Sequence, residues 1–159
     1  MKKVVIILML VVFLVGCSRE TFEKVEDENL QTVLQPQKQM LIDTEEDAVI
    51  LDSRDGRLYL CDGYEVSVQV MPGGNVAGTI KALTGFEGAH LTLLETKENG
   101  MDRYECVWTS VGLYGDTAGR LVIFDDGCYH YAVSILSAAE DAYALQPCWN
   151  QIIDSVTFS

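Results

Sequence analysis

The fold is decided by the stretch RLVIFDDGCYHYAVSIL, residues 120–136. Two runs rich in β-branched and aromatic residues, Arg120–Phe124 and Tyr129–Leu136, flank the triplet Asp125-Asp126-Gly127. Asp and Gly are favoured in tight turns, because the Asp side chain bonds the local backbone and Gly tolerates positive φ. The stretch therefore predicts two antiparallel strands joined by a hairpin turn.

A second hairpin is expected immediately before the first. The runs 91–96 and 103–109 flank Asn99-Gly100, a pair in which both residues tolerate positive φ. The two hairpins together predict a four-stranded antiparallel meander.

The residues that precede the meander indicate three more strands and a short helix. The runs 48–51 and 58–60 surround the turn-prone segment 53–56 and predict a hairpin. Residues 64–71 alternate apolar and polar side chains, as expected for a half-buried strand, and Pro72-Gly73-Gly74 ends this run. The segment 76–83 is weakly helical.

The apolar period changes from two to 3.6 near the C-terminus, which predicts an amphipathic helix. One helical stripe contains Ala138, Ala142, Leu145, Trp149, Ile152, Ile153 and Val156. The segment Ser137–Glu140 has the form of a capping box and predicts the start of the helix. Pro147 lacks an amide proton, so a kink or restart is expected near Gln146. The fold class is therefore α+β, an antiparallel sheet covered by a C-terminal amphipathic helix.

These patterns resemble a known family. The string from Gly119 to Tyr131, the helix after it and the closing segment Trp149–Val156 resemble small uncharacterised lipoproteins of gut Firmicutes. They are also similar to the PsbP-like fold, which the extrinsic photosystem II subunit shares with DcrB-type bacterial lipoproteins. The resemblance covers about residues 48–158. It implies a binding or assembly factor and carries over no catalytic residue, since that superfamily shares no common active site.

The first residues have the features of a bacterial lipoprotein signal. Lys2 and Lys3 precede an apolar run from Val4 to Gly16 that ends at Cys17. The run is too short to span a bilayer, which takes about 20 apolar residues, and it has the charge and small-residue end of a cleavable signal. The segment Leu14–Cys17 resembles the lipobox, in which the cysteine receives diacylglycerol and becomes the new N-terminus. We therefore predict lipidation at Cys17; the alternative is an ordinary secretory signal with a chance cysteine.

The sequence predicts three parts: a signal peptide at 1–16, a lipidated acidic tether at 17–47 and a globular α+β domain at 48–159. The formal charge is −13, and it becomes −15 when Lys2 and Lys3 leave with the signal. Such acidity opposes binding to nucleic acid, whose affinity for proteins comes from Lys and Arg on phosphates. The expected location is the extracytoplasmic side of the cell membrane, with the lipid on Cys17 as the membrane contact.

Cys61, Cys106, Cys128 and Cys148 remain once Cys17 is assigned to the anchor. Four cysteines allow two disulfides in three connectivities, and the sequence does not choose among them. Buried free thiols are the alternative. No pair has the spacing of a zinc site, so no metal or other cofactor is expected.

Two groups of residues deserve examination as catalytic candidates. Cys128 and His130 would share a strand face, but neighbouring side chains on one face of a strand rarely point at each other. We therefore expect His130 to be an ordinary, half-exposed strand residue. Acidic residues on predicted turns are the second group. Their ordinary explanation is structural, because an acidic side chain in a turn hydrogen-bonds the local backbone. That second group contains Glu87, Asp102, Asp116, Asp125 and Asp126. We therefore predict no catalytic residue.

Tyr104, Trp108, Tyr129 and Tyr131 lie on two predicted strands, and we expect most of them to be core residues. The alternative is an exposed aromatic patch for a peptide, glycan or protein partner, which requires that the helix leave one sheet face open. The predicted function is a membrane-anchored, non-catalytic binding or accessory module of the cell envelope, with a possible protein or peptide partner. The alternative is an extracytoplasmic enzyme with an unrecognised acid or thiol site.

Overall fold

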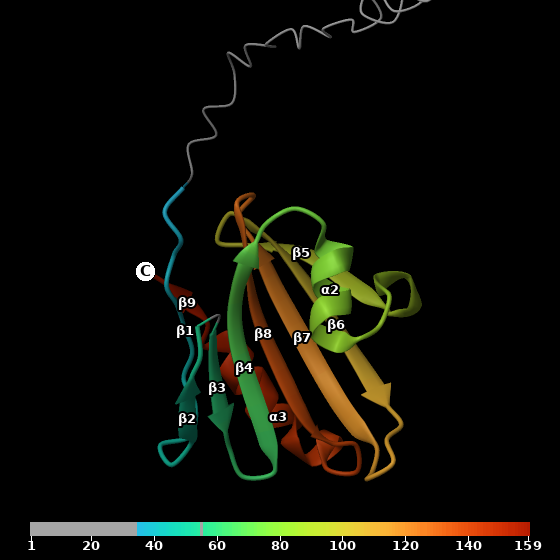
Figure 1. The fold of residues 1–159 in the computed structure, drawn as a ribbon. Coiled ribbons are helices and arrows are strands. Elements are labelled where there is room, and N and C mark those ends of the chain that lie inside the picture. Colours follow the sequence, from blue (N-terminus) through green and yellow to red (C-terminus); the bar gives the residue numbers. More distant parts are fainter. Residues whose placement is uncertain (1–34, 55) are drawn as a thin grey trace, which may run out of the picture. The chain divides into compact units, whose positions relative to one another are not determined.

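Seven strands form one antiparallel sheet in the computed structural model, which describes residues 35–54 and 56–159 (Figure 1). Their spatial order is β2-β3-β4-β8-β7-β6-β5, and every neighbouring pair is antiparallel. In chain order they are β2 (Val49–Asp52), β3 (Gly56–Leu60), β4 (Tyr64–Pro72), β5 (Leu93–Glu98), β6 (Met101–Ser110), β7 (Thr117–Asp125) and β8 (Tyr129–Ala138). The predicted hairpins are β2–β3, β5–β6 and β7–β8, and all three are confirmed.

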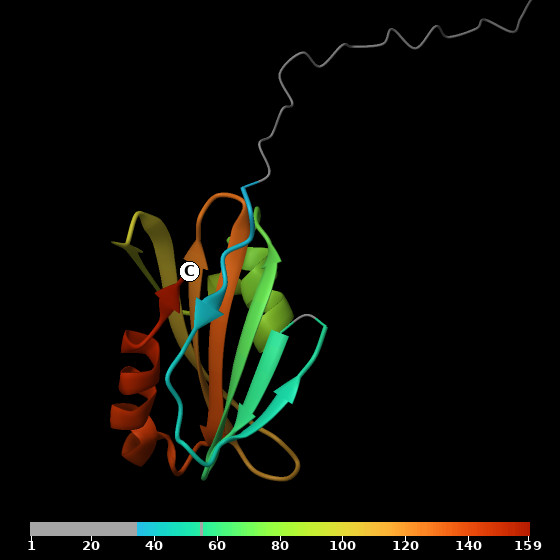
Figure 2. The ribbon, with the colours of Figure 1, turned by 90° about the vertical axis from the view of Figure 1, so that its left-hand side faces the viewer.

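Two helices cover opposite faces of this sheet (Figure 2). The C-terminal helix α3 (Ala142–Asp154) lies on one face, as the sequence predicts. The shorter helix α2 (Val76–Thr84), followed by the single 3₁₀ turn η1 (Gly88–His90), lies on the other face over the β6–β7–β8 side. No described helix has the length and apolar character that crossing a bilayer requires.

Successive side chains of β8 point to opposite faces of the sheet and belong to two separate core layers. Tyr131, Val133 and Ile135 point toward α3 and pack with Trp149 and Ile152. His130, Ala132 and Ser134 point the other way, and Ala132 packs in the layer that contains Ile80 of α2. Both faces of this central strand are therefore buried, which explains its almost unbroken apolar sequence.

The N-terminal part of the domain includes residues that the sequence assigns to the tether. Met40 and Leu41 form β1 and pair with β9 (Thr157–Phe158) in a separate two-stranded sheet. Met40 is buried against the α3-side core, and Gln39 exchanges backbone hydrogen bonds with Ser159. The folded domain thus begins before the predicted boundary at residue 48. The signal peptide, Cys17 and the first half of the predicted tether lie outside the described residues.

The predicted helix start at Ser137 is wrong. Ser137 and Ala138 still pair with β7, and the Ser137 hydroxyl donates to the Ala138 carbonyl instead of capping a helix. The helix begins at Ala142 after Asp141. It then continues through Pro147 to Asp154 without the expected restart.

Candidate functional site

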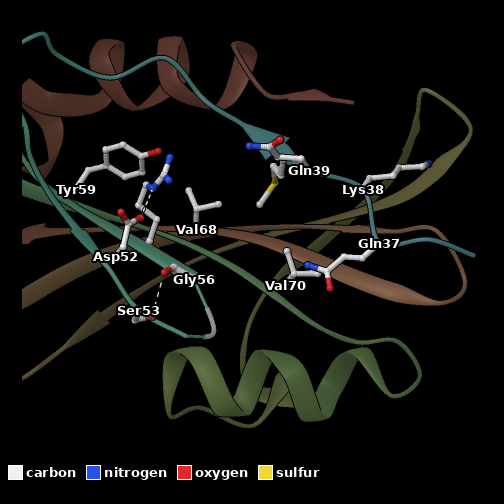
Figure 3. Close-up of a pocket in the computed structure, with 11 residues that line it drawn as sticks. Gln37, Lys38, Gln39, Asp52, Ser53, Gly56, Tyr59, Val68 and Val70 are labelled. Carbon is white, nitrogen blue, oxygen red and sulfur yellow. Dashed lines mark hydrogen bonds and ion pairs between the residues drawn. The ribbon is translucent and has the colours of Figure 1, made fainter.

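A cleft of about 350 Å³ lies between the N-terminal segment and the β2–β3 hairpin. Its apolar floor contains Val68 and Val70 of β4, and polar side chains stand at its two ends (Figure 3). Gln37 and Gln39 come from the segment before β1, while Asp52 comes from the end of β2. The volume is at the lower end of the usual range for ligand pockets, about 300–1,000 Å³.

The one guanidinium of this cleft already has partners. Arg57 Nε lies 2.6 Å from Asp52 Oδ1. A hydrogen bond to Tyr59, and then the bond to Asp52, raise the pKa of Arg57 above its ordinary value. Lys38, the other cation at the cleft, stands at the opposite end from Asp52, the partner of Arg57 (Figure 3). The two cations of the cleft therefore do not converge on one point.

A row of polar side chains crosses the other face of the sheet; it is buried beneath α2 at His130 and exposed at its far end, at Lys97. His130 is completely buried, which corrects the expectation of a half-exposed strand histidine. Its Nδ1 lies 2.8 Å from Thr79 Oγ1 of α2, and its Nε2 lies 3.5 Å from Asp125 Oδ2. Asp102 lies opposite Asp125 across the β6–β7 ladder, and the Lys97 ammonium lies 2.8 Å from its carboxylate. A substrate would reach the imidazole only if α2 moved.

Cys128 has no role in this row. It lies in the turn before β8, and the imidazole of His130 contacts Thr79 and Asp125 instead. The Cys128–His130 pair considered from the sequence is therefore not formed.

The acidic turn residues have separate structural roles. Asp102 and Asp125 face each other, Glu87 pairs with Lys81, and Asp116 accepts the amide of Ala139 through its backbone carbonyl. Asp126 Oδ1 accepts the amides of Cys128 and Tyr129, and its Oδ2 accepts the Tyr131 hydroxyl. Burial would raise the pKa of Asp126, but these hydrogen bonds outweigh it and hold the pKa below its usual value. Among the described residues, no group of three or more His, Cys, Asp or Glu side chains is placed to hold a metal ion.

The aromatic residues pack in the core as expected, and the alternative of an exposed aromatic patch is not formed, because the sheet faces that carry them are covered. Trp108 and Tyr131 are buried, and Tyr104 and Tyr129 are only partly exposed. Trp108 instead packs on Gly119, where an added Cβ would lie 2.3 Å from the indole ring.

The most exposed apolar side chains of the described residues lie at one end of the domain, while a second, less exposed group runs along β2 at Val49, Ile50 and Leu51. In the loop between β6 and β7, Leu113 is 99% exposed and Tyr114 and Val111 are similarly exposed. The start of α3 lies at the same end (Figure 1) and exposes Tyr143. We call Val111, Leu113, Tyr114 and Tyr143 the apolar end surface. A hollow of about 480 Å³ adjoins it, between Tyr114 and Glu140.

Sequence reasoning missed the apolar end surface. The segment Val111-Gly112-Leu113-Tyr114-Gly115 is as apolar as a strand. Gly112 and Gly115, which flank Leu113 and Tyr114, indicate a loop. Large apolar residues in a short loop between two glycines are expected to be exposed.

Comparisons with solved structures identify the fold. LpqN of Mycobacterium tuberculosis, a protein involved in cell envelope biogenesis, superposes with a TM-score of 0.54 at 10% identity, over 79% of this chain and 86% of LpqN. The cyanobacterial PsbP protein of Synechocystis superposes with a TM-score of 0.53 at 8% identity, over 77% of this chain and 92% of that protein. A Bacteroides thetaiotaomicron protein superposes with a TM-score of 0.51 at 13% identity, over 76% of this chain but only 45% of the Bacteroides chain.

Sequence comparisons add no relative, since no protein-family model matches and no curated protein matches significantly. The structural matches to LpqN and to cyanobacterial PsbP cover 79% and 77% of this chain, with TM-scores above 0.5. The domain therefore has a PsbP-like α+β fold, as the sequence predicts.

Proposed function

We propose that this protein is a non-catalytic accessory module of the bacterial cell envelope, of the type found in gut Firmicutes, anchored outside the cytoplasm by lipid on Cys17. The signal-like leader and the lipobox-like segment Leu14–Cys17 support the anchor. The likeness to LpqN, which takes part in cell envelope biogenesis, supports the compartment. The observation that carries the binding role is the apolar end surface.

The apolar end surface is far from where the chain enters the domain. Lys38 Nζ lies 4.0 Å from Met101 Sδ, at the start of β6. The apolar loop follows Ser110, at the other end of this ten-residue strand. At about 3.4 Å per residue, β6 separates the two ends by about 30 Å. A lipid-anchored domain can thus contact a partner at this surface while its entry point faces the membrane.

Charge and shape favour a protein partner at this surface. Large apolar side chains that are almost fully exposed and grouped together mark interaction sites. Asp116, Glu140 and Asp141 are exposed around them, and these carboxylates would be repelled by anionic lipid headgroups. We expect a protein with an apolar pocket for Leu113 or Tyr114 and a basic rim.

The anchor is tested by metabolic labelling with radioactive palmitate. The wild-type protein should incorporate label, and Cys17→Ser should lose it, because the acylated thiol is gone. Cys128→Ser is the matched control and should keep the label. Equal labelling of wild type and Cys17→Ser would reject the anchor at this residue.

The partner surface is tested by placing the photo-crosslinking residue benzoylphenylalanine at position 113 in intact cells. We expect a discrete protein adduct that disappears when Asp116 and Glu140 are both changed to Lys. Thr96, exposed on β5, is the control position and should give no such adduct. Adducts to lipid alone, or the same adduct from position 96, would contradict the assignment.

A further inference from the structure

Two of the four described cysteines lie next to one tyrosine. Cys61 lies in the turn between β3 and β4, and Cys148 lies on α3. Tyr64 Oη is 3.1 Å from Cys148 Sγ, the amide of Cys61 donates to the Tyr64 carbonyl at 2.9 Å, and both cysteines pack against the core cluster that contains Tyr64. Glu45 Oε1 accepts the Tyr64 hydroxyl proton at 2.9 Å. The phenol is thus the point at which the hairpin turn and the helix meet.

The two other cysteines of the domain are too distant to pair with either thiol. Cys128 precedes Tyr129, which pairs with Pro72 at the far end of β4 from Tyr64. Eight residue steps along β4 amount to about 27 Å. A disulfide needs Cα atoms within about 4.4–6.8 Å.

Cys106 is excluded on a different ground. It is buried in the α2-side layer on β6, whereas Tyr64 and Cys148 belong to the α3-side layer. Three inter-strand spacings separate β6 from β4 in the sheet, which is about 14 Å. Cys61 and Cys148 therefore have only each other as disulfide partners among the described cysteines.

We propose that Cys61 and Cys148 form an intramolecular disulfide that ties the β3–β4 turn to α3. The thiols are free in the structure, so closure requires the two sulfurs to move into bonding distance beside the Tyr64 hydroxyl. Cys61 lies in a turn that contains Gly63 at φ +81°, and this short segment can adjust without disturbing the ladder of β4.

A small-molecule disulfide such as oxidised glutathione supplies the chemistry. One protein thiolate attacks a sulfur of the oxidant and releases one molecule of thiol. The second protein thiolate then attacks the mixed disulfide and releases the second thiol. The two protein thiols lose two electrons and two protons, and the oxidant gains both. Because burial raises the pKa of Cys61, its thiolate is scarce at neutral pH, and closure should be faster in mildly alkaline buffer.

The test uses the full chain with Cys17→Ser, so that the leader contributes no thiol. After incubation with oxidised glutathione, the intact mass should fall by that of two hydrogen atoms, and fragment spectra should join Cys61 to Cys148. The melting temperature should rise by several degrees, because the link closes a long loop. Cys128→Ser should behave identically, whereas Cys61→Ser and Cys148→Ser should not close the bond.

Tyr64→Phe provides a second variant in which both thiols remain. It removes the hydroxyl that contacts Cys148 Sγ but leaves both thiols, so the disulfide should still form. Stable glutathione adducts on Cys61 or Cys148 without ring closure would overturn the proposal. A disulfide that includes Cys106 or Cys128, or an unchanged mass, would overturn it as well. The outcome is independent of the membrane anchor.

Discussion

Trp149→Ala is expected to destabilise the folded domain by about 3–5 kcal/mol, as the truncation of a buried aromatic residue does. Trp149 is 4% exposed and belongs to the core layer between α3 and the sheet. Its indole Nε1 is buried with no hydrogen-bond partner among the described residues. The contribution of this side chain is therefore packing, and its removal leaves a cavity under α3.

The measurement is thermal unfolding of the wild type and the variant at matched concentration. For a domain of this size the melting temperature should fall by about 10–20 °C. Tyr143→Ala is the matched control, because Tyr143 lies on the same helix but is exposed, and its melting temperature should hardly change. An unchanged melting temperature for Trp149→Ala would mean that α3 does not cover the sheet.

Glu105→Gln is expected to cost about 3 kcal/mol, at the lower end of the range for breaking a buried ion pair. One carboxylate oxygen, Oε2, lies 2.8 Å from Arg103, and the other, Oε1, accepts Arg120 Nε at 2.7 Å. All three side chains are less than one-fifth exposed. Without this carboxylate, Arg120 loses its ion pair and Arg103 keeps only Glu98, 3.3 Å away, so two guanidinium groups share one counter-ion in a poorly solvated site.

Urea unfolding measures this effect, and a double-mutant cycle with Arg120→Met separates it from packing. The double variant should be more stable than the sum of the two single changes predicts, because removing one cation relieves the repulsion. Glu95→Gln, an exposed change on the neighbouring strand β5, serves as the control. A loss below about 0.5 kcal/mol for Glu105→Gln, the usual size of a surface substitution, would show that the network contributes nothing.

The hairpins were predictable because their signals are local. Asn99-Gly100 occupies the β5–β6 turn with both residues at positive φ, 51° and 80°. The alternation of residues 64–71 matches the alternating burial of β4. In these segments the turn residues and the side-chain period favour the same structure as the tertiary contacts, so the local prediction agrees with the fold.

The start of α3 was not predictable from its capping pattern. Ser137-Ala138-Ala139-Glu140 satisfies the capping-box rule, but Ser137 also lies opposite Tyr64 and Ala118 in the sheet. The ladder bonds on both sides of β8 hold these residues extended. A helix cap stabilises by about 1 kcal/mol, which is less than the stabilisation from the sheet hydrogen bonds on both sides of β8.

The environment of His130 and the strand β1 depend on contacts between distant segments. His130 is buried because α2, which includes Thr79, lies over it, and no periodicity near residue 130 shows this. β1 is only two residues long and exists because β9 pairs with it. Likewise, the sequence does not indicate the pairing of Cys61 with Cys148, because these residues are distant in the chain and come near each other only where α3 packs next to the β3–β4 turn.

The proposed display of the mature protein outside the cytoplasm on a lipidated cysteine is tested by the intact mass of the native protein extracted from membranes of its own cells. We expect a chain that begins at Cys17 and carries diacylglycerol on that residue. An unmodified chain of 159 residues that still begins at Met1 and is recovered from the cytosol would contradict it.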